Sequence, residues 1–501
     1  MKRNNKFASK TDLFTIFIQI ISLLAIIFML GFQLIYINSF ASTWDQVDFA
    51  LGLDRYDIMA MQPHFPGYPY FILGGKFVHL WIENPAKALT IFNILFFSSA
   101  LIPIYFLGRQ YLTREYSLIM TAILYTGSYC LTMVNQPMSE GAALSALWWY
   151  VFSLQTALKS RHPLAGVLPM FLLSILLGIR LSYFPFSIGL FYFFYRKWKE
   201  KHISMKQIFV NTIIAFLFQF VWVLAIAISE GGIKPFIKLA LAFTSGHFQS
   251  WGGAVTAVDL NFVERLRIFI FENIFWTGIL SRSIILLVFY FLLAILFLFS
   301  FKWNNVKQNI QFKLLFILGF CYFLWALFAQ NIDKPRHILP LAMLILFYIF
   351  IVVLAKRNHM PVVLLCIFIL CLQCFNAASL IKEQATHKPA IYKTAEFLNH
   401  YKNPFIVYTW EETRVFDYLN VPFSHKRVQT YNIFVHDAGY YSDKEILLTD
   451  KVVQGFKQQG VDVENNIVKV QHFQSNELFD PVYNEITLYK WKHTSGGEHD
   501  E

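Results

Sequence analysis

The chain has 501 residues, of which 56% are hydrophobic and only 15% are charged, whereas about a quarter of a soluble domain is charged. Several stretches of roughly 18 residues or more carry almost no charge, which is enough to cross a hydrocarbon core of about 30 Å. The net charge of +11 would suit a nucleic acid partner. The basic residues instead form short clusters between apolar stretches, at 2–10, 159–161, 196–201 and 356–357, which is the positive-inside pattern. The composition predicts a polytopic α-helical membrane protein with no nucleic acid partner.

Eleven membrane spans follow when the basic clusters are placed on the cytoplasmic side. They are expected at residues 12–37, 88–108, 116–134, 140–158, 164–179, 182–195, 208–229, 279–301, 312–329, 338–355 and 361–380. The short fifth and sixth spans are separated because basic residues flank both ends of the stretch between Arg161 and Arg196, which places Arg180 near an outer turn. The odd number predicts a cytoplasmic N-terminus and an extracytoplasmic region after Leu380.

Polar sequence is concentrated in three outer segments, 38–87, 230–278 and 330–337, whereas the inner loops are short and basic. Chemistry is therefore expected on the outer face of a membrane domain that spans residues 1–384.

Residues 385–501 have the composition of a soluble domain. Strand-like segments at 405–410, 445–450, 466–470 and 485–491 alternate with helix-like segments at 390–401 and 450–459. This alternation predicts a small extracytoplasmic α/β domain.

Four carboxylates crowd the start of the first outer segment. Asp45 and Asp48 share one face of a helix, and Asp54 and Asp57 repeat the spacing. A solvated surface helix is one interpretation. Because the segment is otherwise apolar, carboxylates there are costly unless they are used or paired. A general base or a metal-binding pair is therefore the better interpretation, with Asp45 favoured because it follows the first span most closely.

The segment "QPHFPGYPYF" (62–71) contains three prolines around His64, so it cannot form a continuous helix. It predicts a rigid turn that leads into an interfacial helix at about 70–82. His64 is either a ligand of the site or part of a simple turn.

The segment "WDQVDFALGLDRYDIMAMQPHFPGYP" (44–69) resembles the first external loop of bacterial GT-C glycosyltransferases. That group is glycosyltransferase family 39-like, and is related to the protein O-mannosyltransferases and the lipid A aminoarabinose transferase. Its pattern "WD…F.LG…D" leads into "QPHPPGYP", from which Phe65 departs. The catalytic Asp of the mannosyltransferases lies in an Asp-x-x-His-Phe context, which Asp45 and Phe49 match, whereas Asp48 replaces the His.

Four further segments resemble the group in the same order, and the match covers roughly residues 10–355. They are "NQPMSEGAAL" (135–144) with Glu140, "LGIRLSYFPF" (177–186) with Arg180, "SGHFQSWGG" (245–253) with His247 and Trp251, and "KPRHILPL" (334–341) with Lys334, Arg336 and His337. The resemblance implies a GT-C fold of about eleven transmembrane helices.

The resemblance also implies the reaction, in which a polyprenyl-phosphate sugar is transferred with inversion to an acceptor hydroxyl of a glycan, lipid or protein. It implies that Asp45 acts as general base with Asp48 beside it, and that basic side chains stabilise the departing phosphate. Arg336 is the best phosphate ligand because a guanidinium can hold phosphate with two prongs. Anchoring to lipid headgroups is the alternative for Lys334 and Arg336.

The remaining substrate-binding candidates are His64, Glu140, Arg180, His247, Trp251 and His337. For Arg180 the alternative is a helix-end residue that reaches the membrane surface. Trp251 either stacks on a sugar or anchors at the interface. His247 either orients a substrate or is an exposed loop residue.

The resemblance points to no cofactor and no obligatory metal. A divalent metal site can nevertheless be assembled from Asp45, Asp48, Glu140 and His247. Two other functions remain open, a polymerase or ligase of lipid-linked polysaccharide and a non-enzymatic transporter or flippase of lipid-linked glycans. The expected location is the bacterial cytoplasmic membrane, among its lipids.

The predicted topology can be tested with reporter fusions. A reporter fused after Arg357 is expected to be cytoplasmic, and one fused after Lys382 extracytoplasmic, because the intervening apolar stretch is long enough to cross the membrane. A cytoplasmic reporter after Lys382 would contradict the side assigned to every candidate residue.

Overall fold

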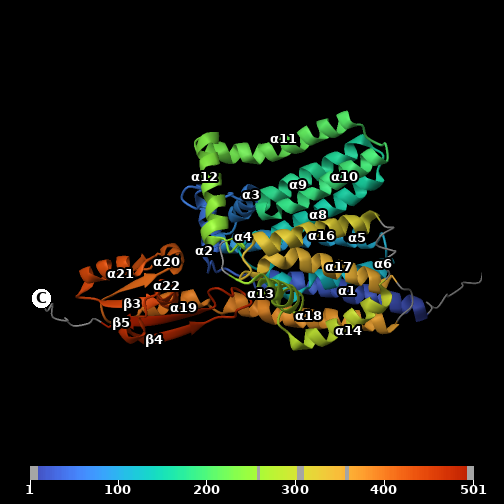
Figure 1. Cartoon of the computed structure of the whole chain (residues 1–501). Helices are drawn as coiled ribbons and strands as arrows, with labels where there is room; N and C mark the ends of the chain where they lie inside the picture. The colour runs from blue at the N-terminus through green and yellow to red at the C-terminus, as the bar shows by residue number, and fades with distance from the viewer. Residues whose placement is uncertain (1–9, 257–259, 302–309, 356–359, 493–501) are drawn as a thin grey trace, which may run out of the picture.

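The computed structural model describes residues 10–256, 260–301, 310–355 and 360–492. Long helices run side by side in a bundle, and the C-terminal domain lies at one end of it (Figure 1), which we call the domain end. The bundle helices are α1 (Lys10–Ile35), α4 (Pro85–Ser98), α5 (Leu101–Gly108), α6 (Arg114–Tyr125), α7 (Ser128–Val134), α8 (Glu140–Lys159), α9 (Val167–Ile179), α10 (Ile188–Lys199), α11 (Met205–Ser229), α14 (Ile284–Ser300), α16 (Ile310–Ala329), α17 (Leu339–Leu354) and α18 (Met360–Thr386).

The bundle has a buried centre and an apolar exterior. Helices α8 and α17 are buried over most of their length, whereas α11 and α14 expose many Leu, Ile and Phe side chains. Such a surface suits a lipid environment, because lipid tails are as apolar as these side chains. The chain is therefore a helical membrane protein.

Each of the eleven predicted spans overlaps one or more of these helices. By length and composition, six helices in the described residues can cross a membrane, or eight if two bent pairs each count as one span. The bends are 59° between α6 and α7 and 107° before α14. The count of eleven spans stays a prediction, and the basic clusters at 2–6 and 356–357 lie outside the described residues.

The first outer segment folds into two short helices joined by a turn. Helix α2 (Trp44–Asp54) begins where the Thr43 side chain accepts a hydrogen bond from the Gln46 N–H, which satisfies one unpaired amide of the first turn. Residues 55–68 form the turn, where Gly67 has a φ of +91° and a Cβ would lie 2.4 Å from the Tyr56 hydroxyl. Helix α3 (Pro69–His79) follows, close to the helix expected at 70–82.

The second outer segment is largely helical. It contains α12 (Ile233–Gly246), the π-helical turn η3 (His247–Trp251), α13 (Phe262–Arg267) and the π-helix η4 (Ile268–Ile279). The third outer segment holds the short 3₁₀-helix η5 (Pro335–Ile338) between α16 and α17.

The C-terminal domain is the α/β unit that the sequence predicts. Its five strands are β1 (Phe405–Thr409), β2 (Ser424–Arg427), β3 (Glu445–Thr449), β4 (Ile467–Gln474) and β5 (Glu485–Trp491), in the order β2-β1-β3-β5-β4. The pairs of β1 with β2 and β3 are parallel, and those of β5 with β3 and β4 are antiparallel. The helices are α19 (Ala390–Asn399), α20 (Glu412–Tyr418), α21 (Tyr431–Ala438) and α22 (Asp450–Gln458).

Helix α2 belongs to both parts of the molecule. Val47 and Ala50 of α2 share an apolar cluster with Ile391, Val415 and Phe416 of the C-terminal domain, and Figure 1 shows α2 and α20 close together. The predicted boundary at 384/385 falls inside the last turns of α18, which runs to Thr386. The first outer segment is therefore held between the bundle and the C-terminal domain.

Candidate functional site

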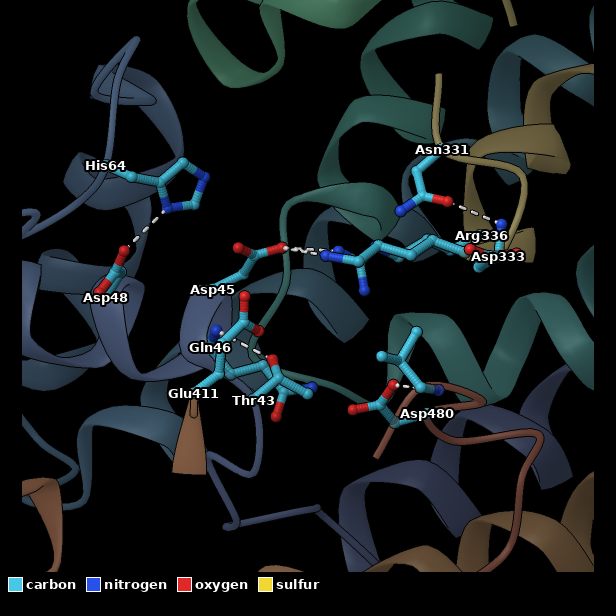
Figure 2. Close-up of polar contacts among 12 residues, drawn as sticks. Thr43, Asp45, Gln46, Asp48, His64, Asn331, Asp333, Arg336, Glu411 and Asp480 are labelled. Atoms are coloured by element: carbon cyan, nitrogen blue, oxygen red, sulfur yellow. Dashed lines mark hydrogen bonds and ion pairs between the residues drawn. The ribbon is translucent and has the colours of Figure 1, made fainter. Parts of the chain in front are cut away.

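Asp45 lies in the first turn of α2 and faces the basic residues of the third outer segment. Its Oδ2 accepts a hydrogen bond from Arg336 Nη2 at 2.6 Å, and Lys334 Nζ lies 3.8 Å from the same oxygen. Figure 2 shows this carboxylate between the His64–Asp48 pair and Arg336. With 27% of its side chain exposed, Asp45 is still accessible to a ligand.

A chain of ion pairs continues from Arg336 into the protein. Glu140 Oε1 lies 2.9 Å from Arg336 Nε and 3.0 Å from Arg180 Nη2. Arg180 also donates to the Ser139 hydroxyl at 2.7 Å and to His337 Nδ1 at 3.1 Å. Because a guanidinium can only donate, His337 Nδ1 is the acceptor. The structure thus brings together six of the predicted residues in one cluster, namely Asp45, Glu140, Arg180, Lys334, Arg336 and His337.

Breaks between helices place these side chains at the domain end. Glu140 begins α8, Arg180 directly follows α9, and Arg336 lies in η5. The break before α8 is held by Asn93, which donates to the Gln136 and Met138 carbonyls and accepts from the Ala142 N–H.

The cluster has an excess of positive charge. Its ion-paired members are Arg180, Lys334 and Arg336 against Asp45 and Glu140, which leaves one positive charge. Burial raises the pKa of the Asp45 carboxyl, but the cations around it, Lys334 first, outweigh burial and hold that pKa well below its ordinary value. The arrangement can accept a singly charged anion at the domain end.

Asp48 occupies a different position from Asp45. Its side chain is fully buried, with Oδ2 3.2 Å from His64 Nδ1 and Oδ1 accepting from Arg414 Nε at 2.9 Å. Burial raises the pKa of Asp48, although both partners oppose it. His64 Nε2 in turn lies 3.1 Å from the Tyr68 hydroxyl. Asp48 therefore orients His64 and does not face Arg336.

Residues of the second outer segment form hydrogen bonds with the backbone from the end of α16 towards Lys334. His247 Nε2 lies 2.8 Å from the Ala329 carbonyl at the end of α16. Arg265 is fully buried and donates to the carbonyls of Leu327, Gly253 and Gln330. Trp251 ends η3, and its side chain lies outside the described part of the chain. His247 is thus placed as a support of the third outer segment.

Sequence reasoning missed Arg265 and Arg414. Arg265 bonds backbone carbonyls, which no side-chain pattern reveals. Arg414 comes from α20, 366 residues after its partner Asp48, and its guanidinium lies 5.6 Å from the Trp44 ring. Arg427 of β2 stacks on the same ring at 5.0 Å and on Trp410 at 4.4 Å. The C-terminal domain therefore fastens the helix that carries Asp45.

The four residues from which a metal site was assembled have other partners. Asp45 and Glu140 pair with arginines, Asp48 with His64 and Arg414, and His247 with a carbonyl. No three His, Cys, Asp or Glu side chains converge as metal ligands among the residues that the structure describes.

The fold is the GT-C membrane fold that the sequence resemblance implied. The chain superposes on two crystal structures of ArnT, the lipid A aminoarabinose transferase, from Cupriavidus metallidurans. The TM-score is 0.52 for the apo state, with 9% sequence identity, and 0.51 for the structure bound to undecaprenyl phosphate, with 8% identity. Each alignment covers 95% of this chain and 99% of that chain. No protein-family model matches the sequence, and no curated protein has significant sequence similarity to it.

Replacing Arg414 tests whether it fastens α2. Arg414→Ala leaves the buried Asp48 carboxylate with only His64 beside it, and breaking a buried pair costs about 3 kcal/mol or more. We expect the unfolding temperature of the detergent-solubilised protein to fall by about 3 °C or more. Arg161→Ala, an exposed arginine at the opposite end, is the control. Equal unfolding temperatures for Arg414→Ala and the parent would contradict the role of Arg414.

Proposed function

We propose that this protein is an inverting glycosyltransferase that moves a sugar from a polyprenyl-phosphate donor to an acceptor hydroxyl. The reaction takes place on the outer face of a bacterial cytoplasmic membrane. The observation that carries the proposal is the contact of Asp45 with Arg336 in a cationic cluster. The same fold occurs in ArnT, which has been crystallised with undecaprenyl phosphate.

The proposed reaction is a single displacement. The acceptor oxygen attacks the anomeric carbon from the face opposite the phosphate, and the bond between that carbon and the phosphate oxygen breaks. Asp45 takes the proton of the attacking hydroxyl, and the lipid phosphate leaves with the electron pair. A retaining mechanism would need a second free carboxylate as nucleophile, whereas Asp48 is buried and paired on both oxygens.

Donor binding activates the base in this proposal. Arg336 and Lys334 neutralise Asp45 in the structure, and a carboxylate with a strongly lowered pKa is a weak base. A lipid phosphate attracts the same cations, so Asp45 loses its partners and its pKa rises when the donor enters. Proton abstraction then becomes effective only in the donor complex.

The other residues of the cluster position Asp45 and Arg336 or add charge beside them. Glu140 is almost fully buried and touches both arginines, so we assign it to the orientation of Arg336. Arg180 adds positive charge behind the phosphate, with His337 as its neutral acceptor. His64, held by Asp48, completes the wall beside Asp45.

The charge of the cluster bears on the alternatives. A transporter or flippase is disfavoured because the paired charges of the cluster lie at the domain end, at the start of α8, just after α9 and in η5. Release of free undecaprenyl phosphate from defined undecaprenyl-phosphate sugars by the purified protein tests the enzyme against the transporter.

Asp45→Asn tests the general base. We expect turnover to fall by about 10²-fold or more, the usual contribution of a general base. Donor affinity is not expected to fall, because the amide no longer competes for Arg336. Asp54→Asn at the exposed end of the same helix is the matched control and keeps parental turnover. Near-parental turnover in Asp45→Asn would refute its assignment as base.

Arg336 is tested by a pair of substitutions. If its guanidinium holds the phosphate with two prongs, Arg336→Lys is impaired as well as Arg336→Ala, because an ammonium is a point charge. The measurement is donor affinity and turnover in detergent with one defined lipid donor, beside Arg267→Lys as a control at an exposed site. Full activity of Arg336→Lys with loss of protein yield alone in Arg336→Ala would assign Arg336 to membrane anchoring.

A further inference from the structure

A polar cleft of about 320 Å³ lies between the bundle and the C-terminal domain. It is bounded by the start of α2, the end of α18 and residues 475–484, which connect β4 to β5 and which we call the β4–β5 loop. Side chains that line it include Gln46, Gln136, Gln384, Asn476, Asp480 and Tyr483. Its volume is at the lower end of the range of small-molecule sites, roughly 300–1,000 Å³.

The β4–β5 loop is docked on the bundle. Leu478 is buried in the apolar core of the bundle, and Glu477 forms an ion pair with Arg282. Asn476 donates to Glu383 Oε2 at 3.1 Å, and Gln136 donates to the Phe479 carbonyl at 3.0 Å. The wall of the cleft that the C-terminal domain supplies is therefore held in place.

Amide side chains are fixed on the bundle side of the cleft. Gln46 accepts from the Ser42 N–H at 2.8 Å and donates to Gln136 Oε1 at 3.0 Å. Gln384 donates to the Thr132 carbonyl at 3.1 Å. Amides positioned in this way can both donate to and accept from hydroxyl groups. Gln46 lines the cleft and directly follows Asp45 in α2.

Asp480 connects the cleft to the charged cluster. Its Oδ1 accepts from the Val482 N–H at 3.1 Å, whereas Oδ2 is buried and has no hydrogen-bond partner among the described residues. Arg336 and Lys334 lie close enough to lower the pKa of Asp480, although burial raises it more. Figure 2 shows Asp480 and Gln46 on the same side of the Asp45–Arg336 contact.

The charged groups around the cleft are mostly engaged. Lys388 pairs with Glu396 at 2.8 Å, and Lys393 donates to the Gln474 carbonyl at 2.7 Å. Glu383 is the acceptor for Asn476. Asp480 lines the cleft with a carboxylate whose Oδ2 has no hydrogen-bond partner among the described residues, and a carboxylate accepts a hydrogen bond from a hydroxyl.

From these observations we infer that the cleft is the acceptor subsite and takes a neutral carbohydrate unit whose hydroxyl donates to Asp480. Its role as acceptor site rests on the proposed function, because only a sugar transferase needs an acceptor beside Asp45. The inference selects a glycan among the three acceptor classes. An anionic sugar or an acidic peptide would leave Asp480 facing a like charge.

The test uses the full chain in detergent and a panel of methyl glycosides. The panel contains neutral hexosides and pentosides, a hexuronic acid glycoside and a hexose phosphate glycoside, and saturation-transfer NMR measures the affinity of each glycoside.

Asp480→Asn removes the charged acceptor at nearly constant volume. We expect this substitution to weaken binding of the neutral glycosides about tenfold, which is the difference between a charged and a neutral hydrogen-bond acceptor. His387→Trp, at the exposed rim of the cleft, is expected to obstruct it with little effect on folding. Asp443→Asn, on the exposed surface of the domain, is the matched control.

Neutral glycosides that bind the parent and Asp443→Asn but bind Asp480→Asn and His387→Trp weakly would support the subsite. Equal binding to all four proteins, no neutral binder in the panel, or a preference for the anionic glycosides would overturn it. Undecaprenyl phosphate binding, followed by native mass spectrometry in the same samples, separates the two proposals. Its absence would refute the polyprenyl-phosphate donor while leaving glycoside binding intact.

Discussion

The ion-pair chain from Asp45 through Arg336 and Glu140 to Arg180 is the constraint on which the domain end depends. Charges this deeply buried are costly, and each is tolerable only because the next one compensates it. The chain joins α2, η5, α8 and the end of α9. Elements that interrupt the helical pattern are therefore tied together by charge, whereas the rest of the bundle is held by apolar packing.

Buried ion pairs of this kind contribute little net stability, because desolvation offsets much of their attraction. Their arrangement is more informative as a preorganised anion site. Donors fixed before the substrate arrives need no reorganisation during the reaction. In the structure Asp45 pairs with Arg336, which is the residue that the proposal assigns to the donor phosphate. Without a donor, the proposed base therefore neutralises the cations that would bind the phosphate.

The C-terminal domain has a structural part in this site. It contributes Arg414 to the buried Asp48 and the cation–π contacts around Trp44. It also contributes the β4–β5 loop, whose Leu478 enters the core of the bundle. Loss of the domain would therefore expose one side of α2, where Val47 and Ala50 are now buried. The domain and the first outer segment form one unit that holds Asp45.

The membrane class, the helical segments and the position of the polar segments between them follow from the sequence alone, because apolar length and the placement of basic clusters are local properties. The sequence also determined the α/β domain, through four of the five strands and two of its helices. Strand β2, "SHKR", was missed because it has no apolar run, and its pairing with β1 depends on the sheet already formed.

Tertiary structure alone decided which charges meet. Asp45 and Arg336 are 291 residues apart, and Asp48 and Arg414 are 366 apart, so no spacing in the sequence relates them. The role of Arg265 could not be predicted for a different reason. Its acceptors are backbone carbonyls, which every residue carries, so no side-chain pattern in the sequence identifies them. Asp480 differs from the exposed aspartates of the C-terminal domain because docking of the β4–β5 loop buries one of its oxygens near Arg336 and Lys334. Ion pairs and buried acceptors depend on distances through space, and those distances exist only once the helices and the domain have packed.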